Sequence, residues 1–93
     1  MTIGVLHMDF IIPGAQSLKD KRRVLKSLKE RLGNRFNCSV AETEYQELWQ
    51  RGRLTVCVVS NDSRHANTQL NEIARFAGAD RGAVLADYRI EML

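Results

Sequence analysis

The sequence of 93 residues predicts a single α+β domain, with a four-stranded antiparallel sheet and two helices on one of its faces. Three observations lead to this prediction. Two segments carry apolar residues at helical spacing, other segments show the alternating or fully apolar pattern of strands, and the order is strand–helix–strand–strand–helix–strand. A chain of this length holds one domain with a small core, so all the elements must share one apolar layer.

The first strand and helix are predicted in the opening third of the chain. Residues 2–12 are apolar on one face and half apolar on the other, which is typical of a central strand. Ser17 and Asp20 match a capping box, in which the serine oxygen binds a free amide and the acid reaches back. A helix then runs to about Leu32, and we expect Gly33-Asn34 to end it in a left-handed turn.

The remaining elements complete the pattern. Residues 36–45 are predicted to be a strand, and residues 46–52 form a connection too long for a tight hairpin turn. Residues 53–61 form a strand that is apolar on both faces. A second helix ends at Gly78, and a last strand covers residues 83–92. Two right-handed crossovers joined by a hairpin give a ferredoxin-like βαββαβ sandwich, and the orientation of Glu42 stays open.

Four short motifs resemble those of the YlxP-like family of small bacterial proteins. They are SLKDKR at residues 17–22, FNCSVAE at 36–42, YQELWQ at 45–50 and VSN at 59–61. The resemblance covers essentially the whole chain and implies a ferredoxin-like fold. It also implies a link to ribosome or RNA biology, because the family's genes often lie near those of translation initiation and ribosome maturation factors. The family has no established activity, so the resemblance implies no catalytic residues.

Basic charge is concentrated in one segment. Residues 19–35 hold eight basic and two acidic side chains, a net charge of +6, whereas the rest of the chain sums to −3. Cations on the helix face opposite the leucines can neutralise phosphates of a nucleic-acid backbone. We therefore predict an RNA-backbone site made of Lys19, Lys21, Arg22, Arg23, Lys26 and Lys29. The alternative interpretation is a solvated helix face, which most charge runs are.

The sheet face without helices lacks the aromatic residues on which RNA-recognition domains of this topology stack bases. Its charged positions are predicted to be His7, Asp9, Asp87 and Glu91. These acids would repel RNA, so we expect RNA on the helix side. The apolar positions are predicted to be Val5, Leu85 and either Val58 or Val59. This mixture favours a homodimer packed sheet against sheet, and the alternative is a monomer with scattered apolar side chains.

The long connection carries the only tryptophan of the chain, Trp49, with Arg51 two residues later. An exposed tryptophan in a loop can be a partner-binding residue, whereas a buried one anchors the loop to the core. In a domain with so small a core, we favour anchoring. Trp49 and Arg51 are kept as the candidate residues of a partner-binding loop.

No catalytic, metal-binding or cofactor motif is recognisable in the sequence. His7, Asp9, Glu42 and Asp87 have no ligand spacing, and residues 12–17 lack the arginine and glycines of an acylphosphatase-like phosphate loop. We therefore expect no cofactor and no enzymatic activity.

The compartment and partners follow from composition. Two widely spaced cysteines, Cys38 and Cys57, are expected to be free thiols in a reducing compartment, and no apolar run is long enough to cross a membrane. We expect a cytoplasmic, non-enzymatic accessory protein whose partners are ribosomal RNA or ribosome-associated factors. The alternative is a dimeric module that binds proteins or senses a small anion.

Overall fold

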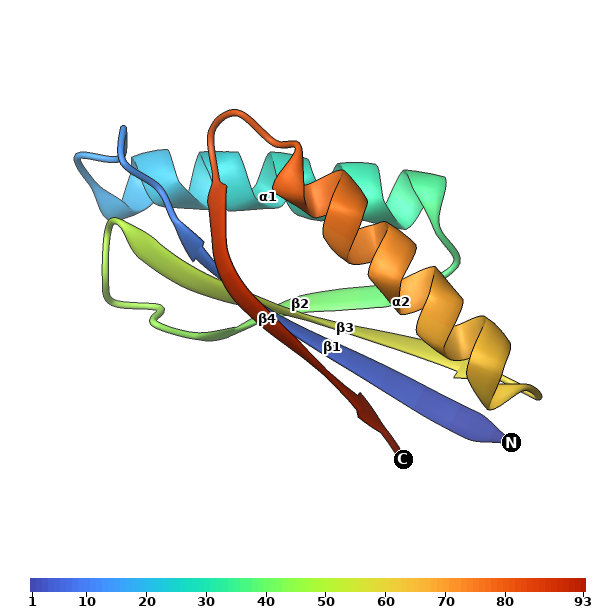
Figure 1. Cartoon of the computed structure of the whole chain (residues 1–93). Helices are drawn as coiled ribbons and strands as arrows, with labels where there is room; N and C mark the ends of the chain where they lie inside the picture. Colours follow the sequence, from blue (N-terminus) through green and yellow to red (C-terminus); the bar gives the residue numbers. More distant parts are fainter.

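The computed structural model describes residues 1–93 and confirms the predicted order of elements (Figure 1). The strands are β1 (Thr2–Ile11), β2 (Ser39–Glu44), β3 (Arg51–Ser60) and β4 (Val84–Met92). They form one antiparallel sheet in the order β2-β3-β1-β4. The helices α1 (Leu18–Arg35) and α2 (Ser63–Gly78) both lie on one face of this sheet. This is the ferredoxin-like fold, and it leaves one face of the sheet open.

The core is one cluster of 17 buried residues between the sheet and the two helices. Two glycines on the central strands let the helices come close. A Cβ atom at Gly52 would lie 2.7 Å from the Leu25 side chain, and one at Gly4 would lie 2.8 Å from the Leu70 side chain. Neither of the two helices is both long and apolar enough to span a lipid bilayer.

The start of α1 follows the prediction and its end does not. The Asp20 amide donates to the Ser17 hydroxyl at 3.0 Å, while the Asp20 carboxylate accepts from the Gln16 amide at 3.1 Å. The helix then continues past Gly33 to Arg35, so the predicted left-handed stop is wrong. The ring of Phe36 packs edge-on against Phe76, 5.8 Å away, on the core. This packing, a tertiary contact, outweighs the roughly 1 kcal/mol that a glycine costs inside a helix.

A β-bulge in β4 changes which side chains face the core. Asp9 pairs with Asp87 and Phe10 with Leu85, so Ala86 is left as the extra residue. Because the bulge shifts the alternation by one residue, Leu85 packs against the core on the helix side. The prediction that Leu85 lies on the open face is therefore wrong.

The two cysteines lie on opposite faces of the sheet. Cys38 packs against the core, whereas Cys57 points to the open face, where it pairs in register with Ser39. Both are free thiols. Burial raises the pKa of the Cys38 thiol, which lowers its reactivity.

Candidate nucleic-acid interface

The outward face of α1 carries a continuous set of exposed cations, which we call the α1 ridge. It consists of Lys19, Arg22, Arg23, Lys26 and Lys29, all of them exposed. None of them forms an ion pair with a carboxylate of the chain. Glu30 is exposed on the same face but pairs with none of them, and Asp20 binds the Gln16 amide instead. The ridge is therefore free to meet an anionic partner.

Lys21, predicted as part of this site, is completely buried. Its Nζ lies 3.0 Å from Oε2 of Glu42 and donates a hydrogen bond of 2.5 Å to the carbonyl of Tyr45. The prediction that Lys21 contacts RNA is wrong. Its position explains why, because Lys21 precedes the buried Leu25 and Leu28 by four and seven residues and so lies on their stripe.

The ion pair with Lys21 shows which way the Glu42 side chain points, which the sequence left open. Glu42 points toward the helices, in register with Leu54. Its Oε2 is buried and receives no aligned hydrogen bond, so the charge of the ammonium group is what compensates it. Burial of such a pair is tolerated only while both partners are present.

The ridge borders a shallow hollow between α1 and the strands β2 and β3. The hollow measures about 290 Å³, and its lining comprises Arg22, Leu25, Lys26, Lys29, Glu42 and Leu54. Three of these residues are ridge cations, so this flank concentrates positive charge along the β2 edge of the molecule. A phosphate backbone lying here would meet several cations in succession.

The opposite flank of α1 borders a larger cleft of about 570 Å³ beside the loop between α2 and β4. Arg23 and Arg81 line it, but Arg31 is occupied, because its guanidinium donates to Asp80 at 2.6 Å. Burial tends to raise the pKa of Asp80, yet the hydrogen bonds from Arg31, Ala83 and Gly82 outweigh it and hold the pKa low. This flank is thus partly neutralised by the chain itself.

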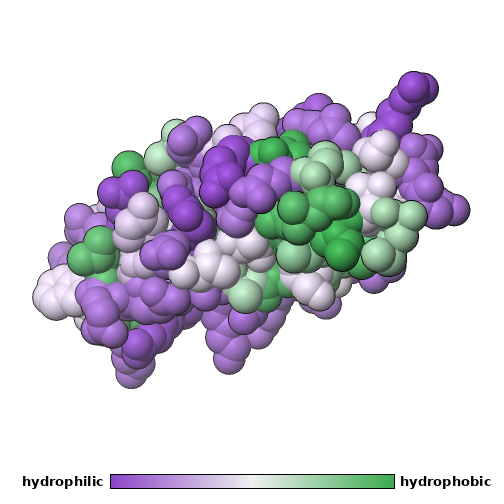
Figure 2. All heavy atoms as spheres, turned by 90° about the horizontal axis from the view of Figure 1, so that it is seen from below, coloured by the Kyte–Doolittle hydropathy of each residue, from purple (hydrophilic) through white to green (hydrophobic).

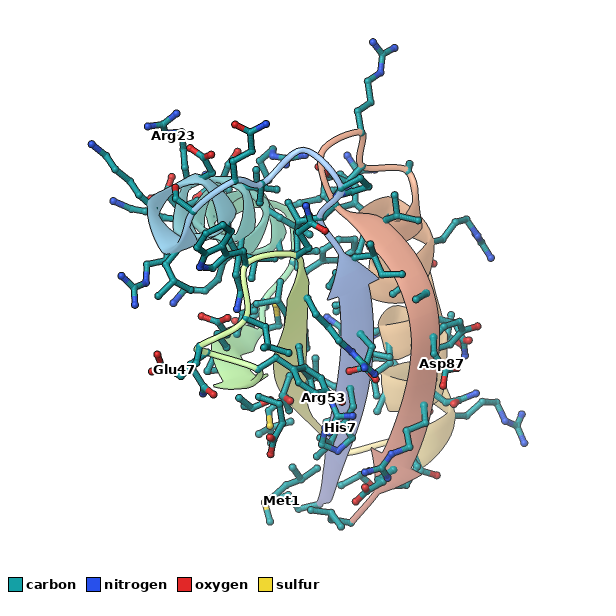
Figure 3. All side chains as sticks on the ribbon, turned by 90° about the vertical axis from the view of Figure 1, so that its left-hand side faces the viewer. Met1, His7, Arg23, Glu47, Arg53 and Asp87 are labelled. Atoms are coloured by element: carbon teal, nitrogen blue, oxygen red, sulfur yellow. The ribbon has the colours of Figure 1, made fainter.

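The open face of the sheet carries charged side chains from neighbouring strands, among them Arg53 and His7 (Figure 3). Arg53 on β3 makes two hydrogen bonds to the Asp9 carboxylate on β1, at 2.6 and 3.1 Å. The Nε2 atom of His7 lies 3.2 Å from Glu91, which Arg89 also contacts. The hydrogen bonds from Arg53 hold the pKa of Asp9 below its ordinary value. These cations are engaged within the chain.

One end of the open face is apolar. Figure 2 shows an apolar patch on one side of this face. The residues with side chains there are Ile3, Val5, Cys57, Val59 and Leu93. Val59 is 70% exposed and Leu93 72% exposed, whereas Val58 is buried under the helices. The structure thus selects Val59 as the open-face valine.

The candidate acid–base residues do not converge. His7, Asp9 and Asp87 lie on the open face, but Glu42 lies on the helix face. The structure contains no group of three or more His, Cys, Asp or Glu side chains placed to hold a metal ion.

The family described as "Protein of unknown function (DUF503)" matches residues 3–90 of this chain. The chain belongs to this family. The uncharacterized protein YlxP of Bacillus subtilis (strain 168) is 38% identical to it over 74 residues, which cover 80% of each protein. The resemblance carried by the four sequence motifs is therefore confirmed. Among solved structures, the de novo designed protein Ferredog-Diesel is similar, with 18% identity, a TM-score of 0.48, and coverage of 98% of this chain and 84% of the design.

In this DUF503 chain, the loop of residues 45–50 is anchored by a residue that the sequence did not single out. The Gln50 side-chain amide donates to the carbonyls of Pro13 and Ala15, at 3.3 and 3.0 Å. The backbone carbonyl of Gln50 accepts from the Ile12 amide at 2.9 Å. Trp49 is 53% exposed, so the interpretation that it anchors the loop is wrong. Trp49 stays a candidate for contact with a partner.

Arg51, the other predicted partner-binding residue, is the first residue of β3, and it is exposed but not free. Its guanidinium lies 4.3 Å from the ring centroid of Tyr45, in a cation–π contact. Arg53 approaches the same ring at 5.7 Å. The two arginines therefore help to hold Tyr45 in place.

Proposed function

We propose that this protein binds the phosphate backbone of RNA through the α1 ridge and acts as a non-enzymatic accessory factor in RNA or ribosome biology. The observation that supports this most directly is the state of the ridge cations, which are exposed and have no carboxylate partner within the chain. The choice of RNA is supported by the gene neighbourhood that the family resemblance implies.

The ridge is unfavourable for the isolated protein, which is a reason to expect a partner. Like charges three and four residues apart on a helix repel each other. Lys19 also lies in the first turn of α1, where the helix dipole disfavours positive charge. Bound phosphates relieve both effects at once.

Binding of this kind is salt-dependent and tolerant of sequence. The ridge presents charged groups at the tips of flexible side chains, which neutralise phosphates without reading base edges. The open face of the sheet takes no part, because Arg53 and Arg89 are paired with carboxylates of the chain and the unpaired carboxylate of Asp87 would repel RNA.

A mobility-shift titration with ribosomal RNA tests the proposed function. Replacing Arg22, Lys26 and Lys29 by glutamine should weaken binding on the order of 100-fold at low salt, because three phosphate contacts are lost. The matched control removes the same charge elsewhere, with Arg64→Gln, Arg75→Gln and Arg89→Gln, and should retain most of the affinity. Equal losses in both variants would point to net charge alone, and absence of binding at low salt would rule the function out.

A second candidate property, homodimerisation through the open face, is favoured by the apolar patch. Val59 and Leu93 are exposed beside the half-buried Ile3, an apolar surface that a second copy could cover in a two-fold sheet-to-sheet contact. Light scattering after gel filtration should give the mass of a dimer for the natural chain and of a monomer for Val59→Lys. A monomer at every concentration of the natural chain would exclude this contact.

A further inference from the structure

We propose that the loop of residues 45–50 stacks an unpaired base of the same RNA whose backbone lies on the α1 ridge, with the indole of Trp49 as the stacking surface. This base site presupposes the proposed function. It narrows the ligand to single-stranded RNA, or to structured RNA with an unpaired nucleotide, and it excludes a continuous duplex as the preferred partner.

Trp49 is exposed in a way that the fold does not require. More than half of its surface is accessible, and the neighbouring Leu48 is 49% exposed, in a domain that has few aromatic residues for its core. Together with Glu47, Gln50 and Arg51 they line a hollow of about 490 Å³. Proteins that bind unpaired nucleotides stack the bases on exposed aromatic rings of this kind.

The loop is held in one conformation before any ligand binds. The carbonyl of Tyr45 accepts hydrogen bonds from the buried Lys21 ammonium at 2.5 Å and from the Leu48 amide at 3.0 Å. Tyr45 itself has φ = 64°, a left-handed conformation that a bulky residue adopts only when its surroundings impose it. A surface fixed in this way loses little conformational entropy when a base stacks on it.

The loop and the ridge adjoin at one end of the molecule. Gln50 is hydrogen-bonded to Pro13 and Ala15, just before α1 begins, and Lys21, which holds Tyr45, is followed directly by the ridge residue Arg22. In Figure 1 the loop between β2 and β3 lies at the same end as the start of α1. Figure 3 shows Glu47 and Arg23 on the same side of the molecule. One strand can therefore reach both features.

The chemistry of the hollow suits a base better than a phosphate. The carboxylate of Glu47 belongs to its lining and would repel a phosphate. The same carboxylate can accept a hydrogen bond from the exocyclic amino group of a base. Arg51, the cation of the hollow, is already engaged over the ring of Tyr45. Phosphates are therefore assigned to the ridge and the base to the loop.

The fluorescence of Trp49 gives a direct test, because it is the only tryptophan of the chain. The full chain is titrated with a short single-stranded RNA, with the same strand in a continuous duplex, and with a duplex that carries one bulged nucleotide. We expect the single strand and the bulged duplex to quench the fluorescence with the same midpoint as binding measured by polarisation. The continuous duplex should bind through the ridge without quenching.

Substitution of the ring provides the second arm. Trp49→Leu should weaken binding of the single strand about tenfold and leave the continuous duplex unaffected. Tyr88→Leu is the matched control, because Tyr88 is a similarly exposed aromatic residue on β4, away from the loop. It should change neither affinity.

The outcomes separate the base site from the ridge. If the ridge variant loses affinity while Trp49 is neither quenched by the single strand nor needed for its binding, the base site is wrong and the proposed function stands. If Trp49→Leu weakens the single strand and the continuous duplex equally, the loop contacts the backbone and base stacking is again overturned. If no RNA binds at low salt, both inferences fail.

Discussion

The outer face of α1 and the open face of the sheet both carry cations, but they differ in where the opposite charges lie. On the sheet, Arg53 is bonded to Asp9, and Arg89 and His7 both contact Glu91. On α1, the five ridge cations have no such partner. Cations that are balanced within the chain support the fold, whereas unbalanced ones are available to an anionic partner.

The same contrast exists within α1 itself. Lys21 is buried and paired with Glu42, while Arg22 and Lys26 are exposed and unpaired. These residues belong to one basic run in the sequence. Their roles differ because the helix turns each side chain by about 100° from the preceding one, so that adjacent residues meet different surroundings.

We expect the largest change in stability when the buried lysine is replaced, and almost none when an exposed ridge lysine is replaced. Lys21→Met should lower the free energy of unfolding by about 3 kcal/mol, because it leaves the Glu42 carboxylate without a counter-charge and the Tyr45 carbonyl without a donor. Lys26→Met, the matched control on the ridge, should change it by less than about 0.5 kcal/mol. Urea denaturation measures both.

A second substitution sharpens this prediction. Adding Glu42→Leu to Lys21→Met should recover part of the lost stability, since no buried charge then remains. Similar losses from Lys21→Met and Lys26→Met would show that the buried ion pair has no special weight in the fold.

The salt dependence of RNA affinity should differ between variants of the ridge and variants of the sheet. If four ridge cations contact phosphates of a single strand, affinity should fall about 50-fold between about 50 and 200 mM salt. Replacing Arg22, Lys26 and Lys29 by glutamine should reduce this slope to about a quarter. The sheet variant Arg53→Gln with Arg89→Gln should keep the natural slope. A flattened slope in the sheet variant would assign the binding surface to the wrong face.

The ion pair between Asp9 and Arg53 should make the stability of the protein depend on pH in the acid range. Arg53 holds the pKa of Asp9 below its usual 3.8, so the pair stabilises the fold above that pH and is lost as pH falls through the lower folded-state pKa. At neutral pH, Asp9→Asn should cost about 1 kcal/mol. In acid, that difference from the natural chain should disappear.

Asp87→Asn is the matched control for the acid titration. Asp87 lies opposite Asp9 on β4 but has no cation partner. Thermal unfolding followed from neutral pH down through the acid range should therefore show no comparable convergence with the natural chain. If it did, the acid sensitivity would come from the general charge of the face and not from the ion pair.

The smallest expected effect concerns the ridge in the absence of RNA. Arg22→Gln and Lys26→Gln should each raise the stability of the free protein by about 0.3 kcal/mol, because each removes a like-charge neighbour. The gain should shrink at high salt, which screens the repulsion. Arg89→Gln, which removes a paired cation, should give no gain. Melting curves at low and high salt check all three variants.

Much of the fold and the basic character of the candidate site could be predicted from the sequence. The order of elements, the capping box at Ser17 and the concentration of basic residues in α1 follow from local patterns of a few residues. The end of α1 could not be predicted, because it depends on the contact between Phe36 and Phe76. The face of the sheet on which Leu85 lies could not be predicted either, because it depends on a bulge in β4. A bulge reverses which face of the sheet the following side chains occupy, and the apolar pattern of this strand does not reveal where it lies.

Apolar periodicity and charge are properties of neighbouring residues, so the architecture and the basic helix can be predicted from the chain alone. Which of the basic charges are free depends on how the sheet and the helices pack. Lys21 is paired because Glu42, in register with Leu54 on β3, points to the helix side of the sheet beneath α1. Ion pairing depends on distances between residues far apart in the chain, and those distances exist only after the sheet and helices have packed together.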